Sequence, residues 1–560
     1  MKVPFLWLGV LASSVTLAYG QTGGTRPATT ERAPTPTPAA SAIKVVRLVD
    51  AVRNQDQQRV RTLLRQHVDV NVRSEDGSTA LLWAAYWDDI ETADLLIRAG
   101  ANANTSNDFR STPLSSACTN GSAAMVDRLL KAGANPSTPI ATGETPLMTC
   151  AKSGSVEAVK MLLVHGAEVN AKEPSQNQTA LMWAAAERHT DVVRTLIEAG
   201  ADFQAHTKRG FTPLHFAARE GDLETTRLLL AAGVNINILS QPDASGDATA
   251  GGARGGPGRG GAARGGGARG GAARGAAFAV GRGPDTGASA GSTPLLVATV
   301  RGQVPLALAL LDSGADPNMG DAGFAPLHWA VTTWESPTSN PLYGFAEPMG
   351  GIPDRQEKLQ LVKALLAHGA NPNARMTRRP PGFAGGYDDA AGATPFLLAS
   401  SVADVEMMRL LLAAGADPKL VTATNTTAVM AATGLHHTVG ESAVTEPEAL
   451  EAVKLLLERG VPAGGVTTFN ENALFGPAYR GWNTLLELLI KNGADVNVVS
   501  KAGVTPWLAA SGFGDRLGGV LYNKDGADIL AGHGADPKLG HPCQAQNRCR
   551  ELVSDDPKRP

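Results

Sequence analysis

The sequence predicts an all-helical solenoid, built from a unit of about 33 residues that recurs along most of the chain. Two kinds of landmark carry this prediction. A threonine typical of a helix N-cap recurs, at spacings of 33, 33, 34 and 33 residues, at Thr79, Thr112, Thr145, Thr179 and Thr212. A glycine typical of a helix end keeps the same period at Gly100, Gly133, Gly166, Gly200 and Gly233. Two landmarks in step are much harder to obtain by chance than one.

The unit is clearest in residues 210–237, which read GFTPLHFAAREGDLETTRLLLAAGVNIN. Thr212 is placed to cap a first helix with its hydroxyl, and Pro213 suits the first helical position. Leu214 and the small residues that follow it form one apolar face, and the leucines of 223–230 form the apolar face of a second helix. Because such a unit is apolar on both flanks, it cannot fold alone and needs neighbouring copies.

This unit resembles the ankyrin repeat, in which a short helix, a turn and a longer helix are followed by an extended finger loop. The resemblance implies that ligands, usually proteins, bind across the finger tips and the first helices. It also implies that His215 and His328, which occupy the histidine position of the family's TPLH motif, form hydrogen bonds that join repeats. We count about twelve repeats on this pattern.

The first 41 residues are expected to lie outside the solenoid. Residues 1–20 hold Lys2, an apolar run and the small-residue pattern Ala18-Tyr19-Gly20, which is typical of a cleavable secretory signal. An uncleaved anchor is the alternative. Residues 21–41 are rich in Pro, Thr and Ala and predict a disordered linker. We therefore expect an exported protein, periplasmic or extracellular, with no transmembrane segment after signal cleavage.

Repeats one to six are expected in residues 42–242, and the first, which lacks the Thr-Pro motif, is atypical as a terminal unit must be. Residues 243–291 form an insertion of Gly, Ala and Arg that cannot bury enough apolar surface to fold. Its arginines are Arg254, Arg259, Arg264, Arg269, Arg274 and Arg282. The chain has a net charge of −3, and removing these six positive charges leaves about −9 for the rest.

Repeats seven to twelve are expected in residues 292–540, with further insertions at 334–354, between two helices, and at 376–391, in a finger. Residues 541–560 read as a short tail. One continuous solenoid is the preferred arrangement, and two stacks joined by a flexible hinge at 243–291 are the rival.

No catalytic motif is present, and we expect neither enzymatic activity nor a cofactor. The chain lacks a G-x-S-x-G elbow, H-E-x-x-H and a P-loop. His436 and His437, with Glu441 nearby, are a weak pattern for a metal site, and none is predicted.

The four cysteines fall into two classes. Cys118 and Cys150 lie six residues after Thr112 and five after Thr145, and we interpret this offset as evidence for two buried thiols rather than a disulfide. Cys543 and Cys549 lie in a polar tail, where a local disulfide is expected. A metal site formed with His541 is the alternative, but it lacks a fourth ligand.

Aromatic and arginine side chains at solvent-facing positions of the repeat pattern are candidates for partner binding, because such residues dominate interface energetics. They are Tyr86, Trp87, Phe109, Arg110, Arg209, Phe211, Arg219, Tyr479 and Arg480. Partial burial against the next repeat is the alternative for Tyr86, Trp87 and Phe211. Trp83, Trp183, Trp329 and Phe216 occupy a position that the family fills with leucine, and we assign them to packing.

The sequence thus predicts a non-catalytic scaffold of the cell envelope or extracellular space that binds a protein partner. The alternative is an envelope-organising or adhesive component, in which the six arginines of the insertion bind an anionic polymer or surface. Nucleic acid is not an expected partner of an exported protein, and the identity of the partner and the oligomeric state stay open.

Overall fold

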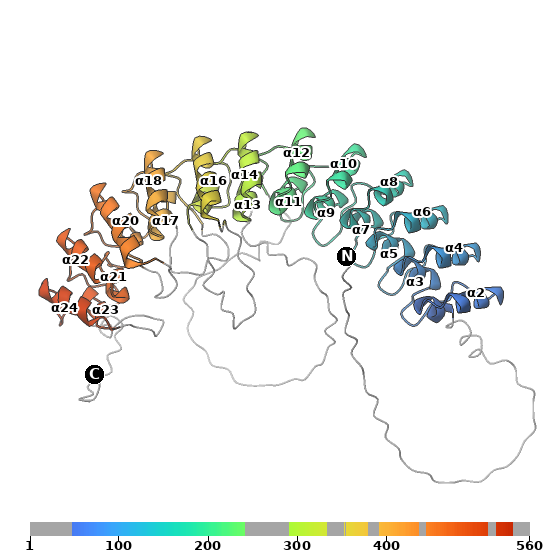
Figure 1. Ribbon diagram of the computed structural model, residues 1–560, viewed down its shortest axis with the longest axis horizontal. Helices are drawn as coiled ribbons and strands as arrows, with labels where there is room; N and C mark the ends of the chain where they lie inside the picture. Colours follow the sequence, from blue (N-terminus) through green and yellow to red (C-terminus); the bar gives the residue numbers. More distant parts are fainter. Residues whose placement is uncertain are drawn as a thin grey trace, which may run out of the picture.

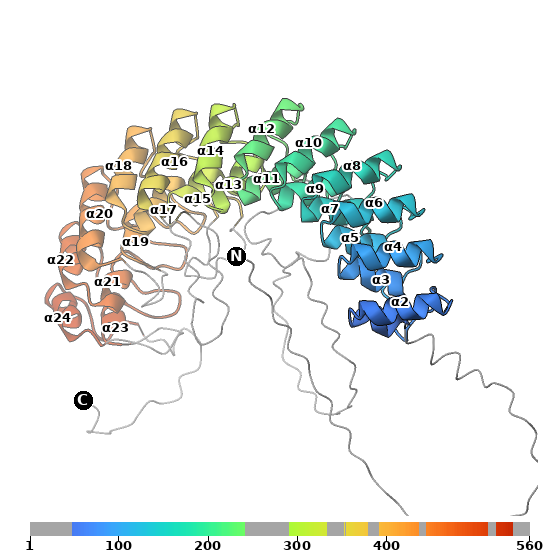
Figure 2. The same ribbon diagram turned by 45° about the vertical axis from the view of Figure 1, so that its right-hand side comes forward.

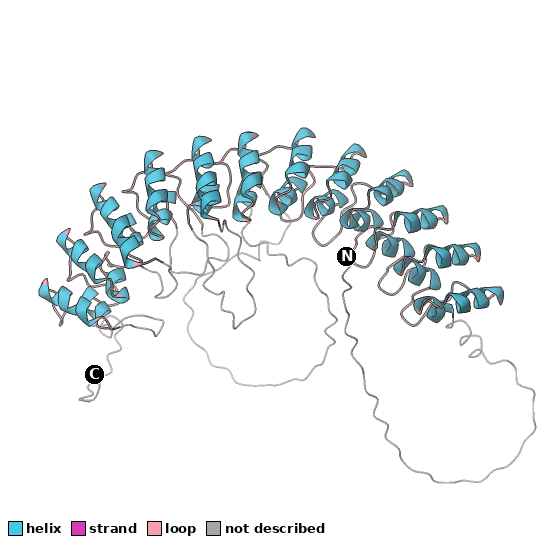
Figure 3. Ribbon diagram, in the orientation of Figure 1, coloured by secondary structure: helices cyan, strands magenta, loops and turns pink. Residues whose placement is uncertain are grey.

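The computed structural model describes residues 48–240, 291–332, 352, 354–378, 391–435, 444–512 and 522–540. Within these ranges the chain consists of helices and loops, with no strand (Figure 3). The helices alternate along the chain between a shorter first helix and a second helix, and consecutive pairs stack side by side. The predicted all-helical ankyrin solenoid is confirmed.

The first helices form the inner layer of an arch (Figure 1). Residues 48–53 are the described part of the first helix of the first pair. The first helices that follow are α3 (Ala80–Tyr86), α5 (Pro113–Thr119), α7 (Pro146–Ser153), α9 (Ala180–Ala186), α11 (Pro213–Glu220), α13 (Pro294–Val300), α15 (Pro326–Ala330), α17 (Pro395–Ser401), α19 (Ala428–Ala432), α21 (Phe475–Arg480) and α23 (Pro506–Ala510).

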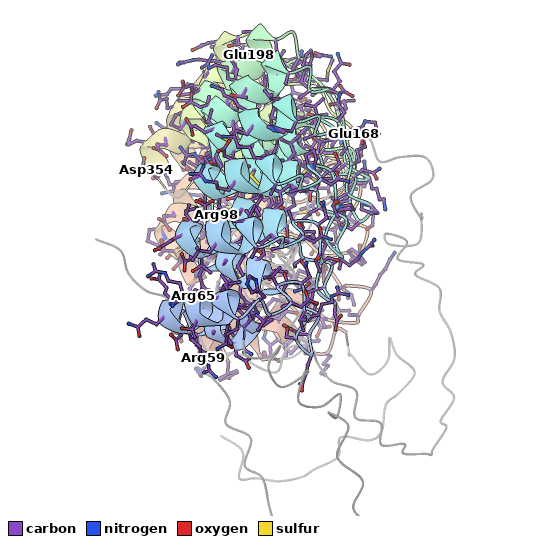
Figure 4. All side chains as sticks on the ribbon, turned by 90° about the vertical axis from the view of Figure 1, so that its right-hand side faces the viewer. Arg59, Arg65, Arg98, Glu168, Glu198 and Asp354 are labelled. Carbon is purple, nitrogen blue, oxygen red and sulfur yellow. A yellow bond between two sulfur atoms is a disulfide. The ribbon has the colours of Figure 1, made fainter. Side chains whose placement is uncertain are left out.

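The second helices form the outer layer of the same arch, with α2 at one end and α24 at the other (Figure 2). They are α2 (Gln57–Arg65), α4 (Ile90–Arg98), α6 (Ala123–Lys131), α8 (Val156–Val164), α10 (Thr190–Glu198), α12 (Leu223–Ala231), α14 (Val304–Asp312), α16 (Arg355–Ala367), α18 (Val405–Ala413), α20 (Glu446–Glu458), α22 (Asn483–Lys491) and α24 (Lys524–Gly532). Charged side chains such as Arg65 and Arg98 stand on the surface of this layer (Figure 4).

The predicted caps set the ends of the helices. The hydroxyl of Thr112 accepts a hydrogen bond from the amide of Ser115 at 3.1 Å, and Thr79 caps α3 in the same way. Thr212 is also the capping residue of its helix, as predicted, but its hydroxyl bonds Nδ1 of His215 at 2.9 Å instead of a backbone amide. The five helix-ending glycines all have positive φ, which explains why this position excludes larger residues.

One helix begins later than its repeat pattern suggests. The pattern places a repeat start at Asn472-Ala473, whereas α21 begins at Phe475. Pro477 has no amide hydrogen and therefore cannot make the intrahelical bond that an earlier start would require of it. Starting at Phe475 puts Pro477 in the first turn, where that bond is not needed.

The stack continues directly across the insertion at 243–291. The first helices α11 and α13 contact each other, and Nε2 of His215 donates to the carbonyl oxygen of Ser292 at 3.0 Å. The amide of Asp316 donates to Oδ1 of Asn237 at 2.9 Å, and Gln303 donates to the carbonyl oxygen of Arg219 at 3.3 Å. The continuous solenoid is confirmed, and the stack passes from Ser240 to Gly291 without a gap. The residues between them lie outside the described ranges.

Both TPLH histidines join repeats as the resemblance implies. Nδ1 of His215 accepts the amide hydrogen of Thr212 at 3.2 Å, and Nδ1 of His328 accepts that of Ala325 at 3.0 Å. Nε2 of His328 donates to the carbonyl oxygen of Ala374, in the next finger. Because Nδ1 accepts a hydrogen bond in each ring, it must carry no proton, and only the neutral imidazole can make this pair of hydrogen bonds. Burial lowers the pKa of both histidines to about 4.

Asparagines in the fingers form a second set of links between neighbouring repeats. Asn71 donates to the carbonyl oxygen of Gly100 at 3.0 Å and accepts from the amide of Asn102 at 2.7 Å. The same two-bond link to the next finger is made by Asn104, Asn170, Asn318, Asn373 and Asn497. Ser137 occupies this position in the third repeat, and its side chain makes no such link within the described residues.

A disulfide joins the third and fourth repeats at this junction. Cys118 of α5 and Cys150 of α7 are bonded, with their Cα atoms 4.4 Å apart, so the prediction of two buried thiols was wrong. When two helices pack side by side in parallel, the side chains at equivalent positions point in the same direction and therefore cannot face each other. An offset of one residue turns a side chain by about 100° around its helix, which is what brings the two sulfurs together.

Other first helices are linked by side chains that hydrogen-bond to the carbonyl end of the preceding one. Asn120 donates to the carbonyl oxygens of Ala85 and Tyr86, and His189 bonds that of Lys152. No side chain of the fourth repeat makes this bond to the end of α5 within the described residues. The disulfide therefore lies where both kinds of polar link are missing.

Removing the disulfide should destabilise the first half of the solenoid. We expect the Cys118→Ala, Cys150→Ala variant to lose about 3 to 4 kcal/mol in the free energy of unfolding, the chain-entropy value for a loop of this length. Urea unfolding with and without reductant would measure it. Reductant should lower the midpoint of the parent and leave that of the variant unchanged. Equal midpoints for reduced and oxidised parent would contradict the assignment.

Acidification should weaken the junctions that contain His215 and His328. The unfolded imidazoles titrate near 6.5 and the folded ones near 4, so their stabilisation is complete above pH 6.5 and is lost as the pH falls towards 4. Each contributes about 3 kcal/mol at neutral pH. The melting temperature of a His215→Gln, His328→Gln variant, compared with the parent at pH 7.5 and pH 5, should show a smaller drop on acidification. Equal drops would contradict this role.

Candidate functional site

The inner face, defined as the surface of the first helices and of the loops that precede them, carries most of the residues predicted for binding. On this face, the fourth and seventh residues after the capping position are half-buried or exposed in repeats two to five. In the second repeat these are Trp83 and Tyr86, and in the third and fourth they are much smaller or polar. The size and polarity of the side chains on the inner face therefore change from repeat to repeat.

Three aromatic rings form a ridge at the end of α3, which we call the aromatic ridge: Trp83, Tyr86 and Trp87. Tyr86 is 52% exposed and Trp87 43%, so the predicted exposure is confirmed. The rings of Tyr86 and Trp87 meet edge to face with centroids 4.9 Å apart. The indole of Trp87 also donates to the carbonyl oxygen of Arg53 at 3.1 Å. The ridge is thus held in place without being covered.

Phe109 and Arg110 stand at the tip of the next finger. Phe109 is 69% exposed, and Arg110 is exposed as well. Arg110 has a φ of 59°, a left-handed conformation that is costly for a residue other than glycine. Its amide nevertheless bonds the carbonyl oxygen of Asn107, and the carbonyl oxygen of Phe109 accepts from the next finger, at Ala141. The strained tip holds an aromatic ring out into solvent.

The candidates of the sixth repeat differ in exposure. Arg209 is exposed, whereas Phe211 is half-buried and packs against the apolar core on both sides of its repeat. Partial burial, the alternative weighed for Phe211, is what the structure shows. Arg219 is paired with Glu220 at 2.6 Å and lies over the ring of Phe216.

The candidates of the eleventh repeat are less accessible than predicted. Tyr479 is half-buried against the core, and Arg480 is half-buried with its guanidinium 5.0 Å from the ring centre of Trp482. Burial lowers the pKa of Arg480. Gly434 leaves the space that the Arg480 side chain occupies, since a Cβ atom at residue 434 would lie 2.7 Å from Nε of Arg480. The predicted exposure of this pair is corrected.

The packing assignments hold to different degrees. Phe216 and Trp329 are buried, as predicted, and Trp83 and Trp183 are half-buried against the core. The ammonium of Lys152 lies 4.5 Å from the centre of the Trp183 ring, and Arg53 lies over Trp83. Both half-buried tryptophans therefore also border the inner face.

Sequence reasoning missed a hollow between α5 and α7, which we call the hydroxyl hollow. It has a volume of about 330 Å³ and is lined by Ser111, Ser115, Ser116, Thr119, Ile140, Glu144, Thr149, Lys152 and Ser153. The hollow exists because Ser116 and Thr149 take the place that Trp83, Trp183 and Phe216 fill in other repeats. Comparing this one position across the repeats would have located it. The disulfide joins the two helices that form its walls.

A larger hollow of about 700 Å³ lies near the beginnings of α16, α18 and α20. Its charges already pair with one another, since Arg355 contacts Asp404 and Glu406 at 2.9 Å each. These two carboxylates raise the pKa of Arg355. It offers a ligand little that is unpaired, and we do not regard it as the candidate site.

The remaining predictions concern residues outside the described ranges: the signal and linker, the six arginines, His436 and His437, and the Cys543–Cys549 pair. Within those ranges no cluster of His, Cys, Asp or Glu is suited to hold a metal. None of the helices there combines the length and the hydropathy that a membrane span requires.

Family models match the chain over three separate regions. The model described as "Ankyrin repeats (3 copies)" matches residues 48–140, 88–173 and 147–240, and "Ankyrin repeat" matches 290–322 and 391–423. A similar solved structure is that of the human ASB11 ankyrin repeat domain. It is 30% identical, and the match covers 34% of this chain and 84% of that one with a TM-score of 0.32.

Proposed function

We propose that this ankyrin-repeat protein is an exported, non-catalytic scaffold of about twelve repeats, which binds a protein partner on the inner face of its first half. Ankyrin repeats indicate a protein-binding scaffold. The observation that carries the location is the exposure of Tyr86, Trp87 and Phe109 on neighbouring repeats. A folded core does not need large aromatic side chains in solvent, and such side chains are the usual anchors of interfaces.

The construction of this surface supports the proposal. Tyr86 and Trp87 pack against each other, and Trp87 is hydrogen-bonded to the first repeat. Arg110 and Phe109 are held by the hydrogen bonds of a tight finger tip. Because these side chains and their backbone are ordered before a partner arrives, association loses less conformational entropy.

Export is proposed from the amino-terminal sequence and is supported by the Cys118–Cys150 disulfide. Disulfides form and persist in oxidising compartments and are rare in the cytosol. A secretory signal followed by a disulfide-bonded domain is a consistent combination.

The partner-binding surface can be tested by capture from an extract of the envelope of the producing cells. The parent should retain a specific protein that a Tyr86→Ala, Trp87→Ala, Phe109→Ala variant loses, because the variant lacks the three anchors. Quantitative mass spectrometry of the eluates provides the measurement. Hot-spot anchors of this kind contribute about 2 kcal/mol or more each.

Val164→Ala is the matched control, since Val164 is 84% exposed but lies at the end of the outer helix α8. It should capture the same protein as the parent. A Tyr86→Ala, Phe109→Ala variant, which keeps the Trp87 hydrogen bond, separates lost binding from lost stability. Equal capture by the parent and both aromatic variants would overturn the assignment of the surface.

A further inference from the structure

The hydroxyl hollow lies beside the surface proposed to bind a partner, and its side chains show which chemistry it accepts. Four of its hydroxyls have already used their hydrogen inside the protein. That of Ser115 donates to the carbonyl oxygen of Thr112 at 2.8 Å, and its oxygen also accepts from the amide of Thr112 at 2.9 Å. Thr119 donates to the carbonyl oxygen of Ser115 at 3.0 Å, Thr149 to that of Thr145 at 3.3 Å, and Ser153 to that of Cys150 at 3.0 Å. Towards a ligand these last three oxygens can only accept hydrogen bonds.

Glu144 adds a charged acceptor. Its carboxylate makes no hydrogen bond or ion pair within the described part of the chain, and it lines the hollow just before the capping threonine of α7. Ser111 and Ser116 keep hydroxyls that are free to donate or to accept among the described residues. Lys152 is the only lining residue that can solely donate, and its ammonium is directed to the ring of Trp183 at 4.5 Å. Acceptors therefore outnumber donors.

The size of the hollow limits its occupant. At about 330 Å³ it is at the lower end of the range of roughly 300 to 1,000 Å³ found for ligand pockets, so it suits one long side chain. The neighbouring first helices, α3 and α9, carry aromatic rings, namely the aromatic ridge and Trp183. Each of the two already holds a cation against a ring, Arg53 at 5.2 Å from Trp83 and Lys152 at 4.5 Å from Trp183.

We infer that the hydroxyl hollow is a binding site for an arginine side chain of the partner protein. A guanidinium carries five N–H donors and no acceptor, which complements a hollow rich in acceptors, and Glu144 supplies the opposite charge. Its planar group also stacks on aromatic rings. A sugar presents donors and acceptors in similar numbers and uses this set of groups less fully. The inference rests on the proposed function, because it names the residue type that the partner presents.

The disulfide gives the site its rigidity. Cys118 precedes Thr119 and Cys150 follows Thr149, so the covalent link joins the two walls next to the acceptors themselves. With no asparagine link at this junction, the distance between the walls depends on this bond and on apolar packing. A fixed spacing favours a planar guanidinium of one size over groups that need the walls to move.

The inference can be tested with small probes, independently of any partner protein. The chain is labelled with 5-fluorotryptophan, and the resonances of Trp87 and Trp183 are assigned with Trp→Phe substitutions. Nα-acetyl-arginine methylamide is titrated and followed by fluorine NMR. Its lysine and citrulline counterparts and chitotetraose, a neutral glycan, are titrated in the same way. The arginine probe should shift the Trp183 resonance saturably, and citrulline, which lacks the charge, should bind at least about tenfold more weakly.

A Glu144→Gln, Thr149→Val variant, nearly identical in shape, should bind the arginine probe at least about tenfold more weakly. Glu144→Gln alone is the second variant in case the pair disturbs folding, which circular dichroism would reveal. Glu168→Gln is the matched control, because Glu168 is exposed in a finger outside the hollow (Figure 4), and it should bind like the parent.

Three results would overturn the inference: equal binding of the citrulline and arginine probes, unchanged binding by the Glu144→Gln, Thr149→Val variant, or no shift up to roughly 50 mM arginine probe. A shift with chitotetraose and none with arginine would assign the hollow to a glycan. If the probe fails while capture still depends on Tyr86, Trp87 and Phe109, the proposed function stands and only the arginine site falls. If the probe binds while capture is unaffected by those variants, the arginine site stands and the proposed partner-binding surface falls.

Discussion

Apolar contact between neighbouring helix pairs is the constraint on which the rest of this structure depends. Each pair exposes apolar residues on both flanks, and each flank is covered by the adjacent pair. A surface built this way has a fixed backbone spacing but a free choice of residues on the inner face. Function can therefore change from repeat to repeat, provided that the contacts between pairs are kept.

Polar links reinforce these contacts unevenly. Asparagine links and buried histidines join many junctions, and the chain passes the insertion at 243–291 with its hydrogen bonds to the next repeat intact. The junction between the third and fourth repeats lacks the asparagine because Ser137 takes its position. The Cys118–Cys150 bond joins this junction covalently.

Most of the fold was predictable because each weak sequence signal, such as a capping threonine, recurs at the same spacing in several repeats. The threonine caps and the glycine ends follow from one period, and the histidine links follow from the resemblance to the ankyrin repeat. The disulfide was not predicted, because the one-residue offset of Cys118 and Cys150 was interpreted without the packing direction of the helices. Tyr479 and Arg480 were placed in solvent because the sequence does not show that Gly434 leaves room for a guanidinium. The hydroxyl hollow depends on residues that are small, which a search for large anchors overlooks.

The hollow and the disulfide follow from the same local choice. Replacing a large first-helix residue by Ser116 and Thr149 removes side-chain contact between α5 and α7 on the inner face, and it opens space between them. Without compensation, two helices that contact each other less would also move more relative to each other. A ligand would then have to order the hollow on binding, and this cost would weaken its affinity. A covalent bond beneath the surface fixes the walls without filling the space that a ligand needs. This combination of small inner residues with a buried cross-link is what distinguishes a binding hollow from a packing defect.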